Sequence, residues 1–215
     1  MSLVGFVGSR SLSPVFSSLV SRVVRSVLSS GRPVAVGCAS GADQFALSAA
    51  LGSLPAPGSS PWVRVFAAFG PGGLASAGRA SAVPAVRAAA ARSASPGHGL
   101  AAPVSVRFWA GGGPGVPLRA RLAGRSSALV SAVAASGSGA GLVAFVSGSP
   151  SASPGSWRSV RLAAAAGVPV VVFLCGCPSS VLPPLWGGSW VAAGSGVWAG
   201  AWRWVPAGSQ PPLFN

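Results

Sequence analysis

The sequence has almost no negative charge, and several common residue types are missing from it. Its 215 residues contain one acidic side chain, Asp43, and no Lys, Glu, Thr, Ile or Tyr. A single carboxylate excludes paired-carboxylate acid–base and glycosidase mechanisms within one protomer, and it excludes Mg²⁺ sites built on two acids. A Ser–His–Asp triad would have to join Asp43 to His98, which lies far along the chain in a Pro/Gly loop.

Long apolar runs are also lacking. The mean hydropathy of +0.61 comes from Ala and Val, diluted by 31 Gly and 20 Pro. The charge-free stretch Ser126–Trp157 is broken by Gly, Ser and Pro, and Leu162–Cys177 is split at Gly167, so neither resembles the ~20 consecutive apolar residues of a membrane span. No basic leader precedes the first apolar run, so we expect no signal peptide and a cytoplasmic protein without a membrane partner.

The three cysteines are an odd number. Cys38, Cys175, Cys177 and His98 together would suffice for a Cys3His zinc site. The spacing of the last two cysteines is C-x-C, however, and Cys38 lies within a turn of small residues. We therefore expect buried free thiols in a reducing compartment, and neither a metal nor a cofactor.

Fifteen arginines and one aspartate give a net charge of +14. Such a charge attracts polyanions such as nucleic acid through counterion release. The missing residue types, however, are mostly those encoded by A-rich codons, so base composition alone would also remove Lys and Glu. Both interpretations remain open at this stage.

Apolar, β-branched runs alternate with segments of helical spacing. We expect strands at residues 3–7, 34–36, 62–68, 104–110, 141–146 and 168–174, and helices at 15–28, 43–50, 83–92, 118–135 and 156–166. Ser13-Pro14 is typical of a helix start and Gly31 of a helix end. The alternation predicts an α/β fold, a three-layer Rossmann-like domain over residues 1–177 with a mostly parallel sheet.

Residues 178–215 form a Trp/Pro/Gly-rich C-terminal appendage. They include five of the eight tryptophans, Trp186, Trp190, Trp198, Trp202 and Trp204. Short apolar bursts at Ser189–Ala192, Gly196–Trp198 and Ala201–Val205 predict small strands or a hairpin packed on the domain. The indoles either cap the sheet edge or, with Arg203, form a platform on which bases stack.

The most informative stretch is VAVGCASGADQFAL, at residues 34–47. A strand, a turn of small residues and a helix start follow one another, so backbone N–H groups and the positive end of a helix dipole are available to an anion. Asp43 lies in the first helical turn. It can orient a ribose hydroxyl or act as a single general base, and it can equally serve the helix dipole and bond the N–H groups of the turn.

Ligands of open parallel sheets bind at the carboxyl ends of the strands. Four loops with small or anion-binding residues are expected there: Gly8-Ser9-Arg10, Gly37–Asp43, Gly70–Gly73 and Gly148–Trp157. Gly lets the backbone approach a phosphate, Ser adds donors, and Arg10 can act as a bidentate clamp. Arg125 is expected to face the same crevice, although both arginines can equally be solvated surface charges.

The order GFVGSRS, VAVGCASGADQFAL, AGRSSALV and LVAFVSGSPSASPGSW resembles the SLOG superfamily of Rossmann-like domains, over about Leu3–Leu174. The nearest branch is the one named after YspA, with the DNA-processing protein DprA as a cousin. The resemblance implies binding of nucleotides or nucleotide-derived ligands, and single-stranded DNA in the DprA branch. The predicted ligand-binding residues are Gly8, Ser9, Arg10, Gly37, Cys38, Ser40, Gly41, Asp43, Arg125, Ser126, Gly148, Gly155 and Ser156.

Two departures from the family pattern matter. Ser126 stands where the family often has Asn, which removes an amide from the site. Relatives that hydrolyse cytokinin nucleotides use a P-G-G-x-G-T-x-x-E turn, whereas Pro154–Trp157 is followed by no Glu. Phosphoribohydrolase activity of that type is therefore not expected.

We thus expect a binder of a nucleotide or nucleotide-derived small molecule, as a monomer or a homo-oligomer. The first alternative is a DprA-like protein that binds single-stranded nucleic acid through its arginines. The second is a hydrolase of the nucleotide glycosidic bond, in which Asp43 is the catalytic and only acid.

Overall fold

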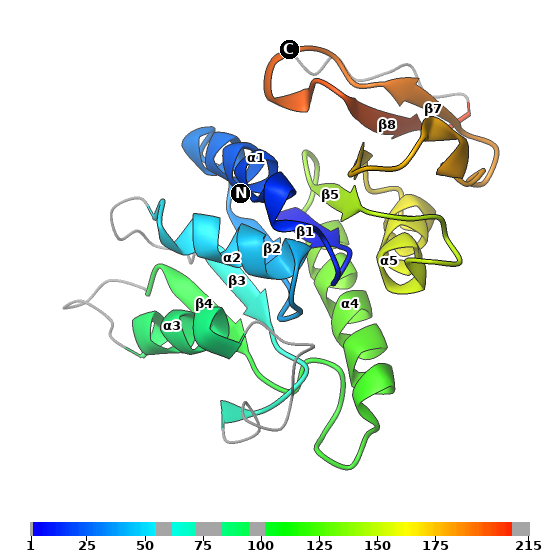
Figure 1. Ribbon diagram of the computed structural model, residues 1–215. Coiled ribbons are helices and arrows are strands. Elements are labelled where there is room, and N and C mark those ends of the chain that lie inside the picture. Colours follow the sequence, from blue (N-terminus) through cyan, green and yellow to red (C-terminus); the bar gives the residue numbers. More distant parts are fainter. Residues whose placement is uncertain (1, 55–61, 72–82, 95–101, 208–215) are drawn as a thin grey trace.

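The computed structural model describes residues 2–54, 62–71, 83–94 and 102–207, and it places an eight-stranded sheet between two layers of helices (Figure 1). The strands are β1 (Val4–Gly8), β2 (Val34–Val36), β3 (Val63–Phe66), β4 (Val104–Arg107), β5 (Gly141–Val146), β6 (Val170–Leu174), β7 (Ser189–Ala192) and β8 (Ala201–Val205). Their order in the sheet is β4-β3-β2-β1-β5-β6-β8-β7. The first six strands pair in parallel, whereas β8 runs antiparallel to β6 and β7 antiparallel to β8.

The two sides of the sheet have separate cores. Helices α1 (Ser17–Ser29), α2 (Ala42–Leu51) and α3 (Val83–Ser93) cover one face, and α4 (Leu118–Ala134) and α5 (Pro154–Ala165) cover the other. Because side chains alternate along a strand, Phe6 packs into the first core and its neighbour Val7 into the second. The predicted α/β, three-layer, Rossmann-like and mostly parallel architecture is confirmed.

Helix α1 follows the predicted apolar pattern. Its buried face consists of Val20, Val23, Val24, Val27 and Leu28. Gly31, at φ +77°, ends the helix as predicted, since this backbone conformation favours glycine. Ser13 and Pro14 take the predicted N-cap and first positions, but in a 3-10 turn, η1 (Pro14–Phe16), that precedes α1. The Ser13 hydroxyl makes no capping hydrogen bond.

Two boundaries differ for identifiable reasons. Strand β4 ends at Arg107 rather than Ala110, because Trp109 adopts a positive φ of 53° that turns the chain away from the sheet. Helix α5 begins at Pro154 rather than Ser156, since proline fits the first helical turn. The Ser-Pro pair that signals a helix start near residue 13 recurs at Ser153-Pro154 and would have identified this start.

The C-terminal segment extends the sheet. After the 3-10 turn η3 (Ser179–Val181), the hairpin β7–β8 pairs with the edge strand β6. Two of the three apolar bursts form strands, whereas the third, Gly196–Trp198, is the 3-10 turn η4. The indole of Trp198 stacks on Phe173 at 6.3 Å. A role of the other indoles in stacking on bases stays a prediction.

Among the helices of the described residues, none combines the length and apolar character needed to cross a bilayer.

Candidate functional site

The connections of the sheet create a switch point between β1 and β5. From β1 the chain proceeds outward through β2, β3 and β4, and then returns to place β5 on the other side of β1. The loops that leave β1 and β5 therefore diverge at the carboxyl edge of the sheet. This edge, between the loops after β1, β2 and β5, is the position at which open α/β sheets bind their ligands, and we refer to it as the crevice.

Ser9 connects the three loops of this crevice. Its Oγ accepts a hydrogen bond from the backbone N–H of Ser147 at 2.9 Å and shares another with Ser153 Oγ at 2.9 Å. Its carbonyl accepts the N–H of Ala42, the first residue of α2, at 3.2 Å. Buried Ser9 thus joins the β5 loop to the start of α2, a bracing role that its predicted place in the crevice did not include.

Asp43 and Arg125 form a buried ion pair. Arg125 Nη1 lies 2.6 Å from Asp43 Oδ2, and the side chains are 8% and 3% exposed. The same Oδ2 accepts the N–H of Ala39 at 3.1 Å. Burial by itself disfavours the charged guanidinium, but the adjacent carboxylate outweighs burial and raises the pKa of Arg125 above its ordinary value.

Two glycines make this arrangement possible. A Cβ on Gly37 would lie 1.4 Å from Arg125 Nη1 and 2.2 Å from Asp43 Oδ2, so only glycine leaves room for the ion pair. Gly41 has a φ of +71°, and a Cβ there would lie 2.4 Å from the Ser9 carbonyl oxygen. The G-C-A-S-G-A-D sequence therefore packs the β2 loop against both Arg125 and the β1 loop.

Helix α5 begins next to Ser9, because Ser153, which bonds the Ser9 hydroxyl, is the N-cap of this helix. Ser156 is buried in its first turn, whereas Gly155 is exposed and a Cβ there would meet nothing within 4 Å. Trp157 is fully buried, and its Nε1 donates a hydrogen bond to the Gly148 carbonyl at 2.8 Å. Trp157 thus anchors the β5 loop from inside the core.

The remaining predicted residues have different surroundings. Arg10 is exposed and its carbonyl accepts a hydrogen bond from Ser40 Oγ at 3.3 Å. The Ser126 hydroxyl donates to the Leu122 carbonyl of its own helix at 3.0 Å, so it is engaged with α4. Part of the Gly70–Gly73 loop lies outside the described residues, as does His98.

An aromatic and a cationic side chain are in contact at the carboxyl ends of β3 and β4. Arg121 of α4 stacks over the ring of Trp109 at 5.1 Å, and its Nη1 donates to the Ala68 carbonyl at 3.4 Å. The close approach of the β4 loop to α4 is possible because a Cβ on Gly111 would lie 1.9 Å from the Arg121 carbonyl oxygen. A Cβ on Gly70, in the loop after β3, would lie 2.2 Å from Trp109 Nε1, so glycine is needed there as well. Neither Trp109 nor Arg121 was predicted at this edge.

The thiols show no metal-binding arrangement. Within the described part of the chain, no three His, Cys, Asp or Glu side chains lie close enough to hold a metal ion. Cys38 and Cys175 are buried and Cys177 is partly exposed. Cys38 Sγ accepts the Ala68 N–H at 3.3 Å, and burial raises the pKa of its thiol.

Alkaline pH is expected to destabilise the protein through these thiols. The sequence has no Lys and no Tyr, so cysteines are the side chains that titrate between about pH 9 and 12. Burial, followed by the nearby Cys177, raises the pKa of Cys175 from 9.0 to about 12. The unfolded chain loses this proton first, so the free energy of unfolding falls as the pH rises above about 9. Urea unfolding from pH 8 to 11 measures the slope, and an equal slope in Cys175→Ala would contradict the assignment.

Comparisons with protein-family models, with curated proteins and with solved structures find no match to this chain. The fold and the site therefore define its class by themselves. It is a Rossmann-like α/β protein with a mostly parallel sheet, in which the order of the strands reverses between β1 and β5.

Proposed function

We propose that the protein binds a nucleotide or nucleotide-derived ligand in the crevice between the loops after β1, β2 and β5. The observation that carries the proposal is the meeting of these three loops at Ser9, at the switch point of the sheet. Helices α2 and α5 both begin at this edge. Their positive ends and the exposed Arg10 favour a phosphate group.

Asp43 has a positioning role in this proposal. Its carboxylate bonds Arg125 and the Ala39 N–H, and it thereby fixes the turn that presents Ser40 and Gly41 to the crevice. The alternatives in which Asp43 holds a ribose hydroxyl or acts as the acid of a glycosidic hydrolase would require this buried pair to open. They remain predictions, and release of free base that stops in Asp43→Asn would favour the hydrolase.

Membership of the SLOG superfamily is part of the same proposal. It is supported by the motifs GSRS and GCASGAD, which form the loop after β1 and the turn between β2 and α2, and by a fold of the kind that the resemblance implies. The YspA-related branch remains the nearest by these motifs.

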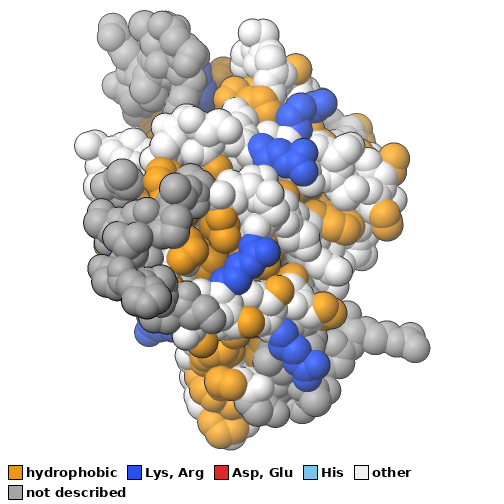
Figure 2. Space-filling view, turned by 90° about the vertical axis from the view of Figure 1, so that its left-hand side faces the viewer, with side chains coloured by type: hydrophobic (Ala, Val, Ile, Leu, Met, Phe, Trp, Pro, Cys, Tyr) orange, Lys and Arg blue, Asp and Glu red, His pale blue; other side chains and the backbone are white. Residues whose placement is uncertain are grey.

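Single-stranded nucleic acid is the rival ligand. Figure 2 shows the arginines of one face spread over the surface with apolar and neutral side chains between them. Such a distribution predicts non-specific attraction, distributed over many arginines, rather than one defined footprint. A nucleic-acid ligand would therefore show an affinity that falls steeply with salt.

The proposal is tested by calorimetric titration with 5′-AMP, ADP and a labelled oligo-dT at two salt concentrations. Arg10→Gln is expected to weaken nucleotide binding about tenfold, because a charge-assisted hydrogen bond is lost. Gly155→Glu is expected to abolish binding, since it places a carboxylate at the start of α5, where it favours the helix dipole but repels phosphate. The exposed position of Gly155 makes this variant compatible with folding.

Two exposed positions provide matched controls. Arg22→Gln removes a charge from α1, and Ser131→Glu adds one to α4 away from its first turns. Both are expected to bind nucleotide normally. Equal losses in the controls, or oligo-dT binding without any nucleotide binding, would contradict the proposed site.

A further inference from the structure

A cavity lies toward the opposite edge of the sheet from the loops after β1, β2 and β5. Its volume is about 830 Å³, within the ~300–1,000 Å³ of small-molecule sites. Val4 and Gly141, which line it, begin β1 and β5, whereas the nucleotide crevice lies where these strands end. We refer to the cavity lined by Val4 and Gly141 as the basal cavity.

The basal cavity has an apolar floor and walls from distant parts of the chain. The floor comes from four neighbouring strands and includes the side chains of Val4, Val143, Val171 and Arg203. The walls are the second half of α1, with Ser26 and Ser30, and the segment around η4, with Ser195 and Trp198. The floor extends over three inter-strand spacings, from β1 to β8, and is therefore about 14 Å wide.

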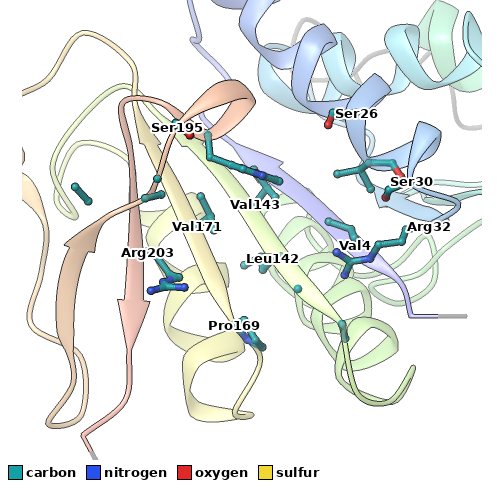
Figure 3. Close-up of a pocket in the computed structure, with 17 residues that line it drawn as sticks. Val4, Ser26, Ser30, Arg32, Leu142, Val143, Pro169, Val171, Ser195 and Arg203 are labelled. Atoms are coloured by element: carbon teal, nitrogen blue, oxygen red, sulfur yellow. Dashed lines mark hydrogen bonds between the residues drawn. The ribbon is translucent and has the colours of Figure 1, made fainter. Parts of the chain in front are cut away.

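Two arginines lie on opposite sides of this floor. In Figure 3, Arg32 lies beside the end of α1 and β1, Arg203 belongs to β8, and Val143 and Val171 lie between them. The strand register places Arg203 beside Val171, and Val171 beside Val143, in one row across the sheet. The apolar surface therefore has positive charge on both sides.

Arg32 is held in place for binding an anion. Its Nη2 donates a hydrogen bond to the Gly139 carbonyl. Burial disfavours the charged guanidinium and lowers its pKa, and a bound anion would offset that cost. The only acidic side chain of the sequence, Asp43, is bound to Arg125 at the other edge of the sheet. No side-chain carboxylate of the protein therefore competes with an external anion at the basal cavity.

We propose that the basal cavity binds an amphipathic organic carboxylate. Its carboxylate pairs with Arg32, and its apolar body lies along Val4, Val143 and Val171. A guanidinium binds a carboxylate with two parallel hydrogen bonds, and burial of the apolar body supplies most of the remaining affinity.

The experiment is calorimetric titration of the full chain with octanoate and, as a neutral probe of equal length, octan-1-ol. Octanoate is expected to bind at one site per chain and octan-1-ol to bind at least about tenfold more weakly, because it lacks the charged partner of Arg32. Arg32→Gln is expected to weaken octanoate by a similar factor. Ser26→Trp retains Arg32 and fills the cavity from its α1 wall, so it is expected to abolish binding.

Arg25→Gln is the matched control, because Arg25 is exposed on α1 and does not line the basal cavity. Unchanged affinity in this variant would support a defined site. The proposal is overturned if octan-1-ol binds as tightly as octanoate, if Arg25→Gln weakens octanoate as much as Arg32→Gln does, or if Ser26→Trp has no effect. Absence of any octanoate binding also overturns it.

Discussion

Asp43→Ala is expected to lower the free energy of unfolding by about 3–5 kcal/mol, the usual cost of removing one partner of a buried ion pair. Arg125 would remain buried with an uncompensated charge, since its side chain is 8% exposed and its Nη1 bonds Asp43 Oδ2 at 2.6 Å. The N–H of Ala39 would lose its acceptor as well. Urea unfolding followed by circular dichroism, analysed by linear extrapolation, measures the change.

The partner variants separate charge from packing. Arg125→Met alone leaves the Asp43 carboxylate buried without its cation, and it is expected to be about as destabilising as Asp43→Ala. The double variant Asp43→Ala/Arg125→Met removes both charges, so it is expected to be more stable than either single variant. Strict additivity of the two single effects would show that the pair is not coupled as its geometry indicates.

The ion pair also explains why the sequence retains one acid. An arginine-rich chain can leave its surface arginines solvated, but a guanidinium inside the crevice wall requires a compensating charge. Asp43 is the residue that meets this requirement, and Gly37 provides the space. The single carboxylate is therefore a structural group, and under the proposed function it acts on ligand binding through the turn that it holds.

The parallel strands and helices could be predicted because their signals are local. Runs such as Gly141–Val146 are buried on both faces and appear in the sequence as continuous apolar stretches. The pattern of α1 is equally plain, with apolar side chains at helical spacing. The Gly196–Trp198 burst shows the limit, because three apolar or small residues do not distinguish a strand from a 3-10 turn.

The site was only partly predictable, since its contacts join distant parts of the chain. The loops at the strand ends were expected at one edge because parallel strands place them there. That Arg125 meets Asp43, rather than solvent or a ligand, depends on the packing of α4 against β2, which no local pattern encodes. The same holds for the basal cavity, where the antiparallel return of β8 places Arg203 across the floor from Arg32.

The second large effect is expected at Trp157. Trp157→Ala should lower the free energy of unfolding by about 3–5 kcal/mol, because a fully buried indole is removed and the cavity left behind collapses only partly. Trp157→Phe retains most of the apolar volume but loses the 2.8 Å hydrogen bond to the Gly148 carbonyl, and it should cost about 1–2 kcal/mol. Trp186→Ala is the control: Trp186 is 63% exposed, so a change within about 0.5 kcal/mol is expected.

Trp157→Phe also tests whether the β5 loop takes part in binding. The indole holds Gly148, and the same loop provides the Ser147 N–H and the Ser153 hydroxyl that bond Ser9. If the crevice binds nucleotide, loosening this loop should lower the affinity for ADP at temperatures where Trp157→Phe remains folded. The affinity of the basal cavity for octanoate should be unchanged. Equal weakening of both ligands would instead indicate a general loss of folded protein, and unchanged ADP binding would remove the β5 loop from the site.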